Sequence, residues 1–144
     1  MIRVGFTGTR AGCTPEQLAA LRKVLEELVP FELHHGDCIG ADAEAHQIAL
    51  DLHQRIVIHP GIYAKDGSSP TRAHCKGANF VLAPMTMFAR NREIVDDTEV
   101  LVGTPRLMTE EELGGTWHTI NHARKKSEPR YIVWPNGSVT KEPA

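Results

Sequence analysis

The sequence lacks any apolar run long enough to cross a bilayer, and charged and polar residues interrupt its first stretch, unlike a secretory signal peptide. It also lacks an excess of either charge, since 16 Lys and Arg residues stand against 18 Asp and Glu residues for a net charge of −2. This balance argues against a broad surface for nucleic acid or for a membrane. The three cysteines have no Cys-x-x-Cys spacing, which argues against a disulfide scaffold. We therefore expect a cytoplasmic globular protein that contacts no membrane, and nucleic acid is not its expected partner.

No internal repeat, low-complexity tract or linker divides the 144 residues, and this length is enough for one hydrophobic core. We expect a single domain over residues 1–144, with a polar tail over 136–144. The clearest element is a helix that begins at Pro15, because Thr14 is a suitable N-cap and Gln17 completes a capping box. Further helices are predicted over 41–53, over 85–97 and from Trp117 onward. Apolar strands are predicted over 2–6, 31–35, 55–59, 100–102 and 131–134.

The predicted strands alternate with helices and are continuously apolar, which is typical of a parallel sheet covered on both faces. The pattern predicts a Rossmann-like three-layer α/β/α fold with a mainly parallel, five-stranded sheet of order 3-2-1-4-5. In that order the loops after the first and fourth strands, 8–12 and 103–116, flank the switch point where α/β folds bind ligands. A further segment, 60–83, shows no periodicity, and its length is typical of a lid or a binding loop.

The segment around Gly114 and Gly115 has the strongest functional pattern. An apolar strand, a polar loop and these two glycines, followed by Thr116, lead into a helix from Trp117 onward. Glycine allows a ligand to approach the backbone, and the N–H groups and dipole of a helix N-terminus favour an anion, usually phosphate. The alternative is a tight turn without a ligand. A second glycine loop, beginning at Gly8, favours a crevice that both loops share.

Candidate ligand-binding residues surround these two loops. Arg10 and Arg90 adjoin them, either as clamps for phosphate oxygens or as ordinary surface arginines. Asp37 has two open roles, binding ribose hydroxyls or capping the next helix. Asn91 either closes the pocket or pairs with a carboxylate, and Trp117 either stacks on a base or belongs to the core. The full expected set is Gly8, Thr9, Arg10, Asp37, Arg90, Asn91, Gly114, Gly115, Thr116, Trp117 and Thr119.

We expect neither a metal ion nor another cofactor. His34, His35, Asp37 and Cys38 are close in sequence, but no pair of them has the i, i+4 or Cys-x-x-Cys spacing that zinc sites typically use. His34 and His35 also point to opposite faces of their predicted strand.

Several motifs, in order along the chain, resemble those of two related families. Residues 8–10 are similar to the opening G-x-R of DNA-processing protein A, 40–50 to its G-x-D-x-x-A-H-x-x-A-L signature, 90–92 to its R-N-R and 115–119 to its G-S-L-I-T segment. Residues 87–90 match the M-H-x-R of the Lonely Guy phosphoribohydrolases, and 115–116 match the G-T of their P-G-G-x-G-T-x-x-E motif. Both families belong to the SLOG superfamily of Rossmann-like domains, and this chain most resembles its small stand-alone members.

Three functions are compatible with these patterns. We expect first a sensor or binding module for a phosphorylated, nucleotide-derived small molecule in the crevice between the loops after strands 1 and 4. The second is hydrolysis of the base–ribose bond of a nucleoside monophosphate, with Arg90 and Asp37 as candidate catalytic residues. The resemblance places Thr119 where the hydrolases have a glutamate, and a hydroxyl does not stabilise the positive charge that develops on the sugar. The third is single-strand DNA binding, which the slightly acidic charge disfavours. The resemblance also implies a homodimer.

Overall fold

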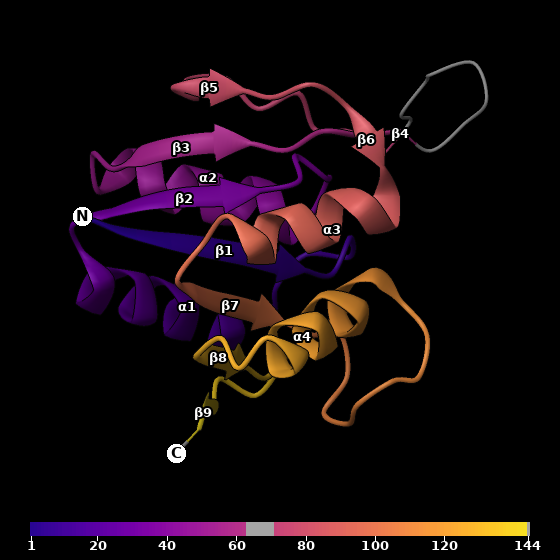
Figure 1. Ribbon diagram of the computed structural model, residues 1–144. Coiled ribbons are helices and arrows are strands. Elements are labelled where there is room, and N and C mark those ends of the chain that lie inside the picture. Colours follow the sequence, from indigo (N-terminus) through magenta and orange to yellow (C-terminus); the bar gives the residue numbers. More distant parts are fainter. Residues whose placement is uncertain (63–70, 144) are drawn as a thin grey trace.

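The computed structural model describes residues 1–62 and 71–143, which form a three-layer α/β/α arrangement around a mostly parallel sheet (Figure 1). Helices α1 (Pro15–Leu28) and α2 (Ala41–Asp51) cover one face, while α3 (Met87–Asp96) and α4 (Gly115–Lys125) cover the other. The strands of the sheet are β1 (Ile2–Gly8), β2 (Phe31–His35), β3 (Arg55–Ile58), β5 (Phe80–Val81), β7 (Val100–Thr104), β8 (Arg130–Val133) and β9 (Val139–Glu142). Strands β4 (Gly61–Ile62) and β6 (Met85–Thr86) form a separate parallel pair. None of the helices in the described ranges is long and apolar enough to cross a membrane.

The sheet has seven strands in the order β5-β3-β2-β1-β7-β8-β9, and only the β8–β9 pair is antiparallel within the described chain. The prediction of five strands in the order 3-2-1-4-5 is therefore wrong in strand number and in the complete order. The expected strands are β3, β2, β1, β7 and β8, and the two unexpected strands extend the edges. Strand β5 pairs through Phe80 and Val81 alone, which is too short to leave a periodic pattern. Strand β9 lies in the predicted polar tail, and its side chains are mostly exposed.

An apolar cluster on each face of the sheet fixes the positions of the helices. The larger cluster packs Phe6 and Leu33 of the sheet with Leu21 of α1 and with residues of α2. The smaller cluster packs Leu101 of β7 with Ile120 of α4. Because α2 and α4 are both anchored in this way, their N-termini are held at the C-terminal ends of β1 and β7.

Helix α1 begins as predicted. The Thr14 hydroxyl accepts a hydrogen bond from the Gln17 N–H at 3.0 Å, and the Gln17 side chain accepts one from the Thr14 N–H at 3.3 Å. The Gln17 amide also donates to the carbonyls of Pro105 and Val133, at 2.9 Å and 2.8 Å. The capping box is thus confirmed, and the same side chain ties α1 to the ends of β7 and β8.

The segment predicted to be an irregular loop, 60–83, is partly attached to the sheet. Its central residues 63–70, on which the predicted lid would depend, lie outside the described residues. Strand β5 pairs with β3, and Cys38 and Arg72 form an isolated antiparallel bridge. The Ala73 N–H donates to the Asp37 carbonyl at 2.7 Å. Residues 71–82 are therefore held by backbone hydrogen bonds at the ends of β2 and β3.

Strand β9 is attached to the rest of the fold by Glu142. Its carboxylate accepts hydrogen bonds from Nε and Nη2 of Arg124, each at 3.0 Å, and from Nε of Arg130 at 2.6 Å. The hydrogen bond with Arg124 is the largest cause that lowers the pKa of Glu142, from 4.5 to about 2. Because the pKa is lower in the folded state, this stabilisation is complete above pH 4.5 and is lost as the pH falls towards 2.

We expect the variant Glu142→Gln to lose less stability than the wild type when the pH is lowered from 4.5 to 2. Urea unfolding at a series of pH values measures this difference. The matched control is Glu26→Gln, an exposed position on α1, which should keep the pH dependence of the wild type. Equal acid sensitivity of Glu142→Gln and the wild type would contradict the assignment.

Candidate functional site

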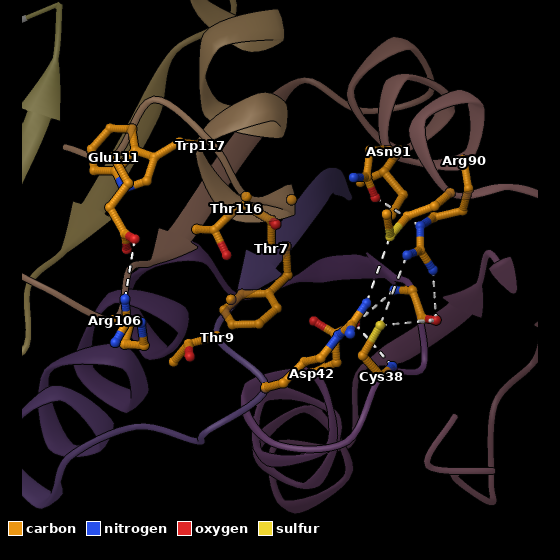
Figure 2. A pocket seen from close by; sticks show the side chains of 18 of the residues that line it. Thr7, Thr9, Cys38, Asp42, Arg90, Asn91, Arg106, Glu111, Thr116 and Trp117 are labelled. Carbon is orange, nitrogen blue, oxygen red and sulfur yellow. Dashed lines mark hydrogen bonds and ion pairs between the residues drawn. The ribbon is translucent and has the colours of Figure 1, made fainter. Parts of the chain in front are cut away.

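A cleft of about 410 Å³ opens at the C-terminal ends of β1 and β7, where the loops after both strands meet the N-termini of α3 and α4 (Figure 2). This is the switch point of the sheet, because β1 has β2 on one side and β7 on the other. The strands that follow β1 in sequence first continue the sheet on the β2 side, and the chain later returns to the opposite side at β7. Asp37 and Thr119 are not among the residues around the cleft. The expected residues that line it are Gly8, Thr9, Arg10, Arg90, Asn91, Gly114, Gly115, Thr116 and Trp117.

The N-terminus of α4 forms one wall of the cleft. Gly114 is the N-cap residue with φ of 117°, a conformation that favours glycine, and no side chain in the described chain caps the helix. A Cβ at Gly114 would meet no atom within 4 Å, so the space in front of the helix is open. The first hydrogen bond within the helix comes from His118 to the Gly114 carbonyl, so the N–H groups of residues 115–117 have no intrahelical acceptor. These donors and the helix dipole make the wall suitable for an anion.

The first loop is held in place by backbone contacts to its neighbours. The Thr9 N–H donates to the Thr104 carbonyl at 3.1 Å, and the Thr9 carbonyl accepts from the Ala41 N–H at 3.0 Å. A Cβ at Gly8 would lie 2.3 Å from the Thr104 hydroxyl and 2.5 Å from the Ala41 side chain. Gly8 is therefore required by the close packing of β1, β7 and α2, and its contribution to the cleft is to allow this packing.

The rim of the cleft carries charges of both signs. Arg10 is exposed, and its Nη2 lies 3.6 Å from the Met87 sulfur at the start of α3. Arg106 and Glu111, from the loop before α4, form an ion pair at 3.2 Å across the other side of the rim (Figure 2). Arg106 is thus paired with Glu111, and Arg10 adds a second positive charge to the rim of the same cleft.

Arg90 was predicted either as a phosphate clamp or as an ordinary surface arginine, and the structure excludes the surface alternative because it buries the side chain. Its side chain is 3% exposed. Nη1 donates to the carbonyls of Gly36 and His59, at 2.8 Å and 3.1 Å. Nε donates to Oδ1 of Asn91 at 2.8 Å (Figure 2). The guanidinium therefore joins α3 to the ends of β2 and β3 beneath the cleft. Asn91, which it orients, has its amide nitrogen facing Gly115, since a Cβ there would lie 3.6 Å away.

Asp37 lies apart from the cleft, in contrast to its predicted ribose contact. It is fully buried with a φ of 59°, and its carboxylate accepts from Arg72 Nε at 2.8 Å and from the Cys75 N–H at 2.9 Å. These contacts direct it to the segment 71–75. Its other predicted role, capping the next helix, is also not observed, because the N-cap residue of α2 is Gly40 and no side chain caps the helix in the described chain. Asp42, inside the first turn of α2, accepts from the N–H groups of Gly36 and Cys38 and so orders the loop before the helix.

Thr119 and Trp117 also differ from the predicted ligand contacts. Thr119 is fully buried, and its hydroxyl donates to the Gly115 carbonyl at 2.8 Å, one turn earlier in α4. The Trp117 ring is 2% exposed and packs 5.8 Å from the Trp134 ring, with the Arg124 guanidinium 5.4 Å from its centroid. Of its two predicted roles, the core role fits the structure, and a ring so buried has no free face for a base.

The sequence analysis missed Asp42 as a residue of the cleft. It lies in the first turn of α2, is 5% exposed and lines the cleft floor beside Cys38 (Figure 2). Burial raises the pKa of Asp42 to about 6, against the opposing effect of the Cys38 N–H. Its position in the G-x-D segment after β2 was the available signal. The structure thus places a carboxyl group with a raised pKa at the base of a cleft whose α4 wall has the open N–H groups of a helix N-terminus.

No protein-family model and no curated protein sequence matches this chain. Solved structures do match. A molybdenum cofactor binding protein from the phototrophic bacterium Rippkaea orientalis has 18% identity and a TM-score of 0.67, over 92% of this chain and 76% of that protein.

DNA processing protein A from Streptococcus pneumoniae is also similar, with a TM-score of 0.64 and 18% identity over 92% of this chain and 50% of that protein. The same protein from Helicobacter pylori, studied for its single-stranded DNA binding mode, has a TM-score of 0.62 and 18% identity over 91% of this chain. This chain spans 64% of the Helicobacter pylori protein and half of the Streptococcus pneumoniae protein. At these identities the likeness concerns the fold, and the chain has the SLOG-like, Rossmann-type fold found in DNA processing protein A.

Proposed function

We propose that this protein is a sensor or binding module for a phosphorylated, nucleotide-derived small molecule, which it holds in the cleft between the loops after β1 and β7. The observation that carries the proposal is the N-terminus of α4, where Gly114 and Gly115 leave the first N–H groups open to the cleft. An anion at this position gains both the hydrogen bonds and the helix dipole.

The remainder of the cleft supports a ligand larger than phosphate. Its volume of about 410 Å³ is in the range of sites for small organic molecules. Arg10 lines the same cleft and offers a positive charge to a phosphate on α4, and Phe6 and Ile94 contribute apolar lining. The fold is also used by a protein that binds the molybdenum cofactor, which supports a small-molecule site without identifying the ligand.

The test is thermal denaturation with a panel of mononucleotides, dinucleotides and ADP-ribose. A ligand at a hundred times its dissociation constant adds about 2.7 kcal/mol of stability. For a domain of this size, we expect the melting temperature to rise by roughly 5–10 °C with the best ligand. Adenosine is the matched control for adenosine monophosphate, and it should shift the melting temperature much less because it lacks the phosphate. A flat response to the whole panel would contradict the proposal.

One observation favours a second function, hydrolysis of the base–ribose bond. Asp42 is a carboxyl group on the cleft floor, and such a group could stabilise the cationic character that develops on the sugar. We rank this function second because Asp42 already accepts two backbone N–H bonds and Thr119 lies behind the wall of the cleft. Chromatography of the same incubations detects free base. Turnover that Asp42→Asn abolishes would make the protein a hydrolase and would displace the binding module.

The same samples also address single-strand DNA as the alternative ligand. Binding of a strand along a positively charged surface weakens steeply with added salt, whereas binding of one nucleotide in a cleft depends less on salt. Tight, salt-sensitive binding of an oligonucleotide together with no response to mononucleotides would support the DNA alternative. We expect the opposite pattern.

A further inference from the structure

Two buried histidines face each other on the side of the sheet that α3 covers. His34 of β2 is 5% exposed, and His59, directly after β3, is 1% exposed. Nδ1 of His34 lies 2.8 Å from Nε2 of His59, with the ring centroids 5.0 Å apart. Asp97, the exposed C-cap residue of α3, completes a group in which one ligand atom from each residue lies within 4.8 Å of the others.

The outward-facing nitrogen of each histidine is bound to a carboxylate. Nε2 of His34 lies 2.8 Å from Oε1 of Glu32, and Nδ1 of His59 lies 2.7 Å from Oε1 of Glu93. Glu32 is itself held by Nε of Arg55 at 3.1 Å. In metal sites, the ring nitrogen of histidine that does not bind the metal usually donates to such a carboxylate or to a carbonyl.

The number of protons in this chain of groups shows what the pair requires. Glu32, His34, His59 and Glu93 make three contacts at hydrogen-bond distance, and each needs one proton. Two neutral imidazoles bring only two protons, and ionised carboxylates accept but do not donate. If both histidines donate outward to the carboxylates, two nitrogen lone pairs face each other at 2.8 Å. A cation between those nitrogens would satisfy every group.

The other buried histidine pair of this protein is a useful contrast, because its protons are sufficient. Nδ1 of His35 accepts from the Asp37 N–H at 2.9 Å, so Nε2 of His35 can donate to Nδ1 of His46 at 2.9 Å. Nε2 of His46 then donates to the Lys76 carbonyl at 2.7 Å. Two neutral rings satisfy all three bonds there, and burial lowers the pKa of His35 to about 3, in agreement with a neutral ring. The pair of His34 and His59 differs, because both of its outer partners are carboxylates. Its three contacts therefore need one positive charge more than two neutral rings supply.

We propose that His34, His59 and Asp97 bind a divalent transition-metal ion of the Zn²⁺ type, with Glu32 and Glu93 orienting the two imidazoles. Two imidazole nitrogens and one carboxylate, with water as the fourth ligand, are a donor set that suits Zn²⁺. Zn–N bonds of about 2.0–2.1 Å require the two nitrogens to separate by roughly half an ångström. Asp97 is exposed and can turn towards the ion. None of the three ligands lines the nucleotide cleft, so this site is independent of the proposed function.

The experiment uses the untagged full chain, stripped of metal with a chelator and free of nucleotide. Calorimetry with Zn²⁺ should give one equivalent bound, and Co²⁺ should give the visible absorption bands of a tetrahedral site with nitrogen ligands. We expect His34→Gln and Asp97→Asn to lower Zn²⁺ affinity by at least about tenfold, and Glu93→Gln by roughly 10–100-fold. Asp97→Asn changes an exposed side chain and so preserves the fold.

The matched controls are Asp96→Asn and His122→Gln. Asp96 precedes Asp97 and is also exposed, and it forms a surface pair with His122 at 3.0 Å. Both control variants should bind Zn²⁺ as the wild type does. Absence of Zn²⁺ binding by the folded wild type would overturn the proposal, and an additional proton would then account for the contact between the two histidines. Unchanged affinity in His34→Gln and Asp97→Asn would also overturn it, because the metal would then bind to other residues. Because no nucleotide is present, either result leaves the cleft proposal intact.

Discussion

Replacing Arg90 with Met is expected to lower the free energy of unfolding by about 3–5 kcal/mol, the largest loss that we expect from a single side chain near the cleft. Met has similar length but no donors, so the carbonyls of Gly36 and His59 and the side chain of Asn91 lose their partner. The His59 carbonyl would then be buried without this donor, and the Gly36 carbonyl would keep only a 4.0 Å contact from Cys38 Sγ. Asp42 would also lose the nearby positive charge that favours its ionised form.

Urea unfolding of Arg90→Met, wild type and Arg10→Met measures this effect. Arg10 is exposed on the rim, so Arg10→Met should change stability by no more than about 0.5 kcal/mol. The two variants should therefore separate the two arginines that the sequence treats alike, since we expect one to stabilise the fold and the other to contact the ligand. A small stability change in Arg90→Met together with complete loss of nucleotide binding would restore Arg90 as a phosphate clamp.

The position of the cleft was predictable because it depends on local and repetitive features. Continuous apolar strands indicate a parallel sheet, and in such a sheet the loops after neighbouring strands meet at one edge. Gly8 is the last residue of β1 and Gly114 directly precedes α4, and both line the cleft. Strands β5 and β9 could not be predicted in this way. One has two residues and the other has mostly exposed side chains, so neither leaves a periodic apolar pattern.

The directions of individual side chains were less predictable, because they depend on distant contacts. Arg90 turns beneath the cleft because Gly36 leaves space for it: a Cβ there would lie 2.2 Å from Nη1. Asp37 has a positive φ and meets Arg72 far along the chain. Thr119 is one turn inside α4, and the cleft meets this helix at its end, so only the first turn faces a ligand. Motif position alone contains none of this information.

The proposed metal site illustrates the same limit. His34, His59 and Asp97 are far apart in the sequence and have none of the spacings that indicate zinc. They come together because β2 and β3 are parallel neighbours and α3 ends beside them. The sequence spacing predicted no metal ion, but spacing reports only on residues that are close in sequence. The argument for a metal site comes instead from residues that the fold brings together.

Replacing Gly115 with Asp is expected to lower the affinity for a nucleotide phosphate by roughly a hundredfold, because two like charges would meet at the N-terminus of α4. The substitution fits the structure. A Cβ at this position would have its nearest neighbour, Nδ2 of Asn91, at an ordinary contact distance of 3.6 Å. Gly115 also has no positive φ, unlike Gly114, so the side chain introduces no backbone strain.

The same variant should not be destabilised, and this makes the test specific. A carboxylate in the first turn of a helix interacts favourably with the dipole, typically by about 0.3–1 kcal/mol. We therefore expect the melting temperature of Gly115→Asp without ligand to equal or exceed that of the wild type, while the shift caused by nucleotide disappears. Gly115→Asn is the matched control, because it has the same shape without the charge and should retain more of the binding. If Gly115→Asp binds nucleotide as tightly as the wild type, the phosphate does not lie at the N-terminus of α4. A carboxylate and a phosphate cannot occupy the same helix N-terminus without a loss of affinity, because their negative charges repel each other.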